Sequence, residues 1–198
     1  MTEALVDTTA IQPCSQLKIS EIILKTGQLD IMKPWYEKIL GVGPFFEHAP
    51  PADARPGDFG GQTRASDLRM CFFRLSLDYP YVQTIGLFEE PGTATGPMPK
   101  GIQGLHHMQM CVASHEALAD KYDALKALGL HPHRSSDHGP MVSFYYRDPD
   151  GNNVEITAQN FPTLEKMVAF MASAEFAANP SGAEIDAEAW VAKVRARA

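Results

Sequence analysis

Hydrophobic and polar positions follow the same order twice along this chain. Residues Ile19 to Thr26 have the β-branched pattern of a strand, and from Asp30 to Leu40 apolar residues recur at helical spacing. The order returns as a strand pattern from Leu105 to Val112, followed by a helical pattern after Ser114, a residue type that favours the N-cap. The pattern therefore predicts two copies of a strand followed by a helix.

The spacing between equivalent positions indicates an internal duplication. Gly41 and Gly129, which close the two helical patterns, lie 88 residues apart, and the two leading strands align at an offset of 86. More strand patterns follow each helix, at 68–75 and 81–88 in the first half and at 141–147 and 153–158 in the second. With one poorly defined strand in each half, we predict an α+β fold of two paired β-α-β-β-β modules.

The rest of the chain lies before, between and after these modules in the sequence. The predicted organisation is a flexible N-terminal arm at 1–16, modules at 17–90 and 105–160, a linker at 91–104 and a helical C-terminal extension at 161–198. Within the extension, 161–176 is helix-compatible and 186–195 reads as a short helix, which favours a surface-packed tail or a dimer contact. The long irregular stretch 47–66 favours either a lid or a tolerated insertion.

Composition restricts the function. The chain has 24 acidic and 17 basic residues, a net charge of −7, which disfavours binding to nucleic acid or an anionic membrane. No apolar run approaches the roughly 18 residues of a membrane span, and the first residues do not resemble a signal peptide. The odd number of cysteines, Cys14, Cys71 and Cys111, favours reduced thiols, so we expect a soluble cytoplasmic protein.

Strand alternation places three ionisable residues on one kind of strand face. His107 and Glu155 lie on the polar faces of the first and last strands of the second half, and Glu21 occupies the position equivalent to His107 in the first half. An unpaired charge is costly to bury within an apolar strand, and a divalent cation would neutralise such a cluster. We therefore predict a metal site with Glu21, His107 and Glu155 as ligands.

Several segments resemble a known family. They are GLHHMQMCV, EIILKT followed by WYEKILGVGPFFE, and above all SFYYRDPDGNNVEI, in which a DPDGN turn joins two strands. They are similar to the vicinal oxygen chelate superfamily, which includes glyoxalase I, methylmalonyl-CoA epimerase, bleomycin-resistance proteins and type I extradiol dioxygenases. The resemblance covers residues 17–161. The tyrosine ten residues before Glu155 and the tail beginning QNF make the extradiol dioxygenases most similar.

The resemblance implies a fold and a set of roles. The two modules would form an open mixed-sheet barrel around one divalent metal ion, with His107 and Glu155 matching the family's ligands. Tyr145 matches the extradiol tyrosine and would donate a hydrogen bond to an oxygen at the metal. His138 lies in the loop before that strand, and an imidazole with an ordinary pKa of about 6.5 can take a catechol proton near neutrality.

Two positions depart from the family's pattern. Extradiol enzymes have histidine where this chain has Glu21, and Gly86 stands where glyoxalase-like and epimerase-like members have a further ligand or catalytic acid. Two carboxylates and one imidazole suit a divalent ion such as Fe²⁺ or Mn²⁺, and the resemblance favours Fe²⁺. The missing acid at Gly86 disfavours isomerase chemistry, which uses protein bases around the metal.

We therefore expect a metal-dependent, extradiol-type ring-cleaving dioxygenase that acts on a catechol-like aromatic diol, as a homodimer. A lyase or isomerase of the glyoxalase or epimerase type is an alternative that Glu21 mildly favours. A metal-free small-molecule binding protein of the resistance type is another. In a further interpretation, Glu21 binds nothing and the metal site has been lost.

Overall fold

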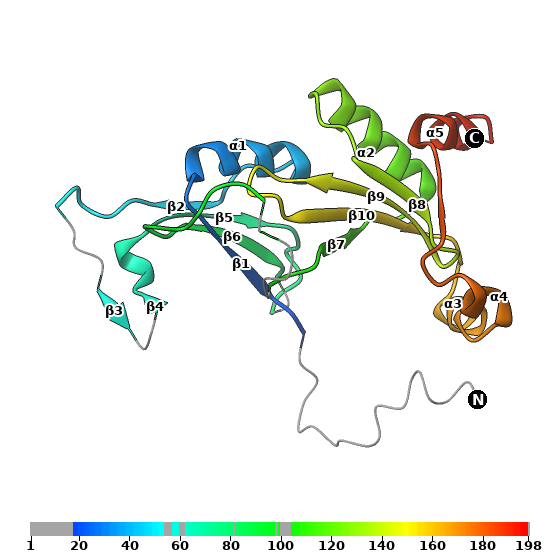
Figure 1. Ribbon diagram of the computed structural model, residues 1–198, viewed down its shortest axis with the longest axis horizontal. Helices are drawn as coiled ribbons and strands as arrows, with labels where there is room; N and C mark the ends of the chain where they lie inside the picture. Colours follow the sequence, from blue (N-terminus) through cyan, green and yellow to red (C-terminus); the bar gives the residue numbers. More distant parts are fainter. Residues whose placement is uncertain are drawn as a thin grey trace, which may run out of the picture. The chain divides into compact units, whose positions relative to one another are not determined.

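The computed structural model describes residues 18–53, 57–59, 62–80, 82–97, 99 and 104–197. They form two compact units (Figure 1). The N-terminal unit holds the described residues from 18 to 99 and the turn Asp148–Gly151, and the C-terminal unit holds 104–147 and 152–197. The predicted N-terminal arm, with Cys14, and most of residues 98–103 of the predicted linker lie outside the described residues.

The N-terminal unit has one helix and one main sheet. The sheet order is β1-β6-β5-β2, in which β1 is parallel to β6 and the other pairs are antiparallel. The elements are β1 (Glu21–Thr26), α1 (Leu29–Leu40), β2 (Phe46–His48), β3 (Asp58–Phe59), β4 (Gln62–Thr63), the 3-10 helix η2 (Ala65–Asp67), β5 (Arg69–Arg74) and β6 (Thr84–Glu89).

The C-terminal unit repeats this order and adds the extension. Its sheet order is β11-β8-β9-β10-β7, in which β7 is parallel to β10. The elements are β7 (Met108–Cys111), α2 (His115–Ala127), β8 (Arg134–Asp137), β9 (Met141–Arg147), β10 (Asn153–Gln159), α3 (Leu164–Met171), α4 (Ala174–Ala178), β11 (Ala183–Glu184) and α5 (Ala187–Arg195).

The predicted α+β fold and the internal duplication are confirmed. The order β1-β6-β5-β2 corresponds strand by strand to β7-β10-β9-β8, with the parallel pair in the same place. Each module's helix lies on one face of its own sheet (Figure 1). Tyr36 of α1 contacts the Phe73 ring, and Tyr122 of α2 contacts the Phe144 ring, so an aromatic pair joins helix to sheet in each unit.

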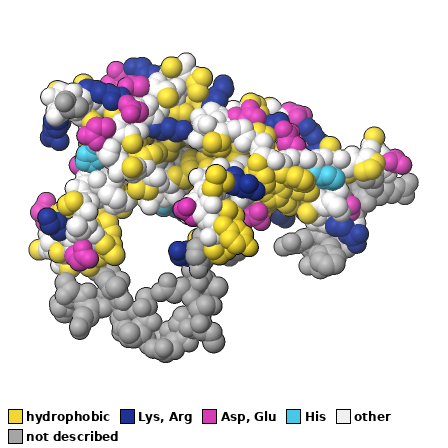
Figure 2. Space-filling view, turned by 180° about the vertical axis from the view of Figure 1, so that it is seen from behind, with side chains coloured by type: hydrophobic (Ala, Val, Ile, Leu, Met, Phe, Trp, Pro, Cys, Tyr) yellow, Lys and Arg dark blue, Asp and Glu magenta, His cyan; other side chains and the backbone are white. Residues whose placement is uncertain are grey.

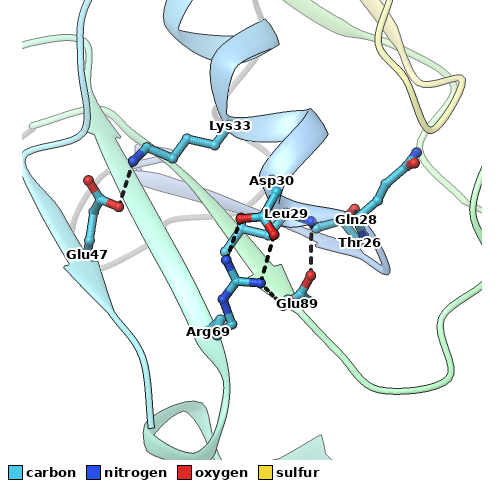
Figure 3. Close-up of polar contacts among 8 residues, drawn as sticks. All are labelled: Thr26, Gln28, Leu29, Asp30, Lys33, Glu47, Arg69 and Glu89. Carbon is cyan, nitrogen blue, oxygen red and sulfur yellow. Dashed lines mark hydrogen bonds and ion pairs between the residues drawn. The ribbon is translucent and has the colours of Figure 1, made fainter.

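Contacts from other elements fix the start of α1 (Figure 3). The N-cap residue Gln28 makes no side-chain cap, and the Leu29 amide instead donates to Glu89 Oε1 of β6, at 3.1 Å. Arg69 of β5 forms ion pairs with both Glu89 and Asp30. Because these acids lie at the helix N-terminus, they also interact favourably with the helix dipole. The sheet therefore caps α1 from outside the helix.

Three element predictions need correction. The strand expected from Leu105 begins only at Met108, so strand alternation does not extend to the residues before it. The stretch 47–66 is not wholly irregular, because it contains the end of β2, the β3–β4 hairpin and the start of η2. The segment 161–176 is not one continuous helix, because Ser173 starts a second helix by accepting a hydrogen bond from the Phe176 amide.

The C-terminal extension packs on its own unit. Val191 and Val194 of α5 are buried, and α5 lies against α2. Arg195 pairs with Asp120 and Asp123 of α2, at 2.6 and 2.9 Å.

On the face drawn in Figure 2, basic side chains lie among acidic ones. No described helix is long and apolar enough to cross a membrane.

Candidate active site

Glu155 is a buried acid in the middle of the C-terminal unit's sheet. It lies on β10 and is 2% exposed, and it pairs across the sheet with Tyr145 of β9 and Gln109 of β7. Side chains of directly paired residues point to the same side of a sheet. We call this side the Glu155 face. The opposite side carries the apolar residues Val154 and Ile156, as strand alternation predicts.

His107, which directly precedes β7, lies beside Glu155. Its Nε2 lies 3.2 Å from Glu155 Oε2, although the two residues are distant in the sequence. The other ring nitrogen, Nδ1, lies 2.7 Å from Nδ1 of His106. Strand alternation alone would put His106 on the side opposite His107, but His106 precedes β7 and is exposed beside His107. His106 therefore orients the His107 ring so that Nε2 faces the carboxylate.

Tyr145 and His138 continue this contact series. His138 Nε2 lies 2.8 Å from the Tyr145 hydroxyl, and each side chain is only partly exposed. Burial, together with the hydrogen bond and negative charge of Glu155, raises the pKa of Tyr145 to about 12. Tyr145 therefore stays protonated at neutral pH. The structure brings four of the five predicted site residues into one series: His107, Glu155, Tyr145 and His138.

The fifth predicted residue, Glu21, belongs to the N-terminal unit. It is exposed at the start of β1 and pairs with Thr84 of β6. Strand alternation puts Glu21, Ile23 and Lys25 on one side of the sheet, which we call the Glu21 face. Among the described residues, no three His, Cys, Asp or Glu side chains are grouped as a metal site. His107 and Glu155 thus provide a pair of donors within their unit.

The donor chemistry of this pair fits a divalent metal ion. The Glu155 carboxylate is removed from water, and among the described residues its ion-pair partner is His107, which is charged only when protonated. A metal ion would neutralise the acid and use the imidazole nitrogen as well. Imidazole and carboxylate ligands suit Fe²⁺ and Mn²⁺.

Gly86 occupies the position in the N-terminal unit that corresponds to Glu155. The pairing shows this, because Gly86 lies opposite Ile23 and Phe72 as Glu155 lies opposite Gln109 and Tyr145. A Cβ atom built on Gly86 would overlap Cδ1 of Ile23 and lie 3.1 Å from two ring atoms of Phe72. Apolar side chains therefore fill the space that a fourth donor or catalytic acid at this position would need.

A cavity of about 570 Å³ opens on the Glu21 face of the N-terminal unit. Ile23, Leu68 and Phe88 line its apolar part. Lys25 and Glu90, which form a 2.6 Å ion pair, contribute polar groups to its lining. The other lining residues, Thr63, Arg64 and Ala65, belong to the stretch predicted to be a lid or an insertion. The lid interpretation itself stays a prediction.

Asn160 was not recognised from the sequence as a functional residue. It follows β10 directly, and its side chain contacts the loop that carries His138. His115 is half-buried and lies 2.8 Å from Asn160 Oδ1. The sequence gives little indication of a role for Asn160, because an asparagine at the end of a strand is more often a turn residue.

A family model and two named proteins each match most of this chain. The family model described as Glyoxalase/Bleomycin resistance protein/Dioxygenase superfamily matches residues 18–156. The chain is 29% identical over 170 residues to Biphenyl-2,3-diol 1,2-dioxygenase 2 of Rhodococcus globerulus. The matched region covers 85% of this chain and 77% of that protein. It is 30% identical over 165 residues to Biphenyl-2,3-diol 1,2-dioxygenase 3 of the same organism, covering 83% and 75%.

A solved structure shows the same fold. It is a glyoxylase/bleomycin resistance protein/dioxygenase domain from Frankia sp. EAN1pec, with a TM-score of 0.56 and 20% sequence identity. The match covers 74% of this chain and 100% of that domain. At this identity the likeness concerns the fold alone.

Proposed function

Because this chain belongs to the Glyoxalase/Bleomycin resistance protein/Dioxygenase superfamily, we propose that it is a metal-dependent, extradiol-type dioxygenase that opens the ring of a catechol-like aromatic diol. The observation that carries the proposal is the contact series of His107, Glu155, Tyr145 and His138. The names of the two Rhodococcus globerulus relatives support this reaction class. The substrate is therefore a small molecule with two neighbouring ring oxygens.

His107 and Glu155 would hold the metal ion, and Glu21 is the proposed third donor. Fe²⁺ is the favoured ion, and Mn²⁺ also suits such donors. When bound, the ion would supply a Lewis-acidic, redox-active centre for a chelating diol and dioxygen. His106 supports this role, because its contact with Nδ1 of His107 leaves Nε2 of that ring as the metal donor.

His138 and Tyr145 would handle protons at the diol. His138 can accept a proton from one substrate hydroxyl, since an imidazole works as a base near neutrality. Tyr145, whose phenol is protonated at neutral pH, would turn its hydroxyl from Glu155 to donate a hydrogen bond to a substrate oxygen. Their 2.8 Å contact fixes the two groups relative to each other. Neither group then depends on the metal ion for its orientation.

The N-terminal unit has a cavity of its own that suits a small molecule. The cavity on the Glu21 face is lined by Ile23, Leu68 and Phe88, and it lies on the side of β1 that also bears the proposed donor Glu21. The volume is in the range of small-molecule sites, and the lining also includes the polar residues Lys25, Arg64 and Glu90. The apolar packing around Gly86 argues against the isomerase alternative, which needs a protein base there.

The test combines metal analysis with oxygen uptake. Protein purified without oxygen should contain stoichiometric divalent metal and consume dioxygen with a catechol panel, giving ring-opened products. His107→Ala and Glu155→Gln should lose the metal, while His131→Ala and Glu165→Gln, at exposed positions outside the series, should keep it. Full metal and activity in both site variants would refute the assignment. Ligand binding without metal would indicate the resistance-type alternative.

A further inference from the structure

The loop that carries His138 is closely tied to the C-terminal extension. His138 donates its backbone N–H to the Met141 carbonyl, and Gly139 donates to Oδ1 of Asp137. Gly139 has a positive φ of 87°, and a Cβ atom there would overlap the ring of Phe170 on α3. The loop thus has little room to move on the side of α3.

Asn160 holds the residues on both sides of His138. Its Nδ2 donates to Asp137 Oδ1 at 3.0 Å and to the Gly139 carbonyl at 2.9 Å, and its backbone N–H donates to the Pro140 carbonyl at 2.8 Å. A single side chain therefore bridges the residue before His138 and the residue after it.

A second contact fixes which way the Asn160 amide points. His115 Nε2 lies 2.8 Å from Asn160 Oδ1, and the His115 ring is 5.3 Å from the ring of Trp190 on α5, edge to face. Since a carbonyl oxygen only accepts, His115 donates to Oδ1, and Nδ2 is left to face the loop. The contacts run from α5 through His115 and Asn160 to the His138 loop.

We propose that Asn160 is a positioning residue, which holds the His138 imidazole where it meets the Tyr145 hydroxyl and the substrate. This inference rests on the proposed function, because it assigns to Asn160 the placing of the group that accepts the diol proton. Loops are mobile unless they are tied to a scaffold. A misplacement of about 1 Å in a reacting group can cost about 100-fold in rate.

The informative variant is Asn160→Asp. It keeps the size of the side chain and an acceptor for His115, but it removes both Nδ2 donations and sets a carboxylate against Asp137. A matched control is Gln28→Glu, which makes the same amide-to-acid change where Gln28 Nε2 donates to Asp150, outside the proposed site. The control shows how much an amide-to-acid change alone lowers kcat when it occurs away from the proposed catalytic groups.

The first measurement is a double-mutant cycle with His138→Ala. Asn160→Asp should lower kcat by about 10- to 100-fold with little change in KM, and should cause no further loss when His138 is already alanine. Gln28→Glu should leave kcat within about twofold of the parent. If the losses from Asn160→Asp and His138→Ala simply multiply, Asn160 has only a structural role and the inference is wrong.

The second measurement is hydrogen exchange, which needs no activity. In Asn160→Asp the backbone amides of His138 and Gly139 should exchange at least about tenfold faster than in the parent, whereas Gln28→Glu should leave them unchanged. Unchanged protection in Asn160→Asp would overturn the inference. If the parent opens no diol ring, the proposed function fails, and the exchange result still decides whether Asn160 fixes the loop.

Discussion

At the scale of single residues, Glu155 is a buried acid whose negative charge needs compensation. A carboxylate that is 2% exposed is costly to keep ionised without a partner, and His107 compensates it only when the imidazole is protonated. A divalent ion would neutralise the carboxylate directly. The burial of Glu155 is therefore an argument for metal binding that does not depend on any relative.

Glu21 allows a direct test of the third donor. Glu21→Gln should weaken metal binding by about tenfold or more, equivalent to about 1.4 kcal/mol, because a charged oxygen donor is lost. Glu21→His should keep Fe²⁺, because it provides the two-histidine, one-carboxylate donor set of non-haem iron oxygenases, and it should raise ring-opening activity. Metal titration and oxygen uptake measure both. If both variants bind as much metal as the parent, and as tightly, Glu21 is not a ligand.

Cys71 gives a prediction for pH. It is fully buried in β5, and burial, with a smaller contribution from Glu47, raises the pKa of its thiol to about 11 from an ordinary value near 9.0. Between these values the unfolded chain loses the proton and the folded chain keeps it. Cys71 should therefore lower stability as pH rises from about 9 to about 11, with no such effect below pH 8.

Urea unfolding at a series of pH values measures this, with Cys71→Ala as the comparison. The parent should lose more stability than Cys71→Ala across the alkaline range. Exposed Cys111 provides an internal reference, because it should react with a thiol reagent in the native protein while Cys71 does not. Equal slopes in the two proteins would contradict the prediction.

At the scale of elements, the two modules begin their helices differently. Ser114 caps α2 within its own segment by accepting a hydrogen bond from the Ala117 amide. α1 relies on Glu89, which reaches it from β6 and also pairs with Arg69 (Figure 3). The same helix position is thus stabilised by a local contact in one module and by a tertiary contact in the other.

Loss of either cap should have a similar effect on stability. We expect Glu89→Ala and Ser114→Ala each to lower the free energy of unfolding by about 1 kcal/mol, since each leaves a helix amide without its acceptor. Glu89→Gln keeps an acceptor for the Leu29 amide and should cost less than Glu89→Ala. Urea denaturation measures all three. An unchanged stability in Glu89→Ala would mean that solvent replaces this cap.

At the scale of the whole molecule, the duplication supplies two sheets with different side chains at equivalent positions. Glu155 and Tyr145 of the C-terminal unit correspond to Gly86 and Phe72 of the N-terminal unit. One Glu–Tyr pair is thus replaced by packed apolar groups in the other module. The two units have kept one architecture and differ in the chemistry that each can contribute.

The proposed metal ion should stabilise the folded protein. At a concentration of about 100 times Kd, binding adds about 2.7 kcal/mol, which corresponds to a rise in Tm of about 5–10 °C for a chain of this size. Glu155→Gln and Glu21→Gln should both reduce this rise, as thermal unfolding with and without Mn²⁺ would measure. A full rise in Glu21→Gln would restrict the donors to the C-terminal unit.

The sequence by itself determined the order of elements and much of the candidate site. Helical and strand periods identified α1, α2, β9 and β10, because these segments bury one face and the apolar residues must repeat with the backbone period. Alternation put Glu155 opposite the apolar residues of β10. The same reasoning did not hold for His106, which precedes β7 and is not part of a strand.

Tertiary structure decided the contacts between residues that are distant in sequence. His115 meets Asn160, and Asn160 meets the His138 loop, only because β10, α2 and the loop converge in space. No local pattern carries this information, since hydrogen bonds of single polar residues leave no period in the sequence. The pairing of β5, β6 and β1 likewise decided that Ile23 and Phe72 fill the space beside Gly86. Local periodicity fixes which face a residue occupies, and packing fixes what it meets there.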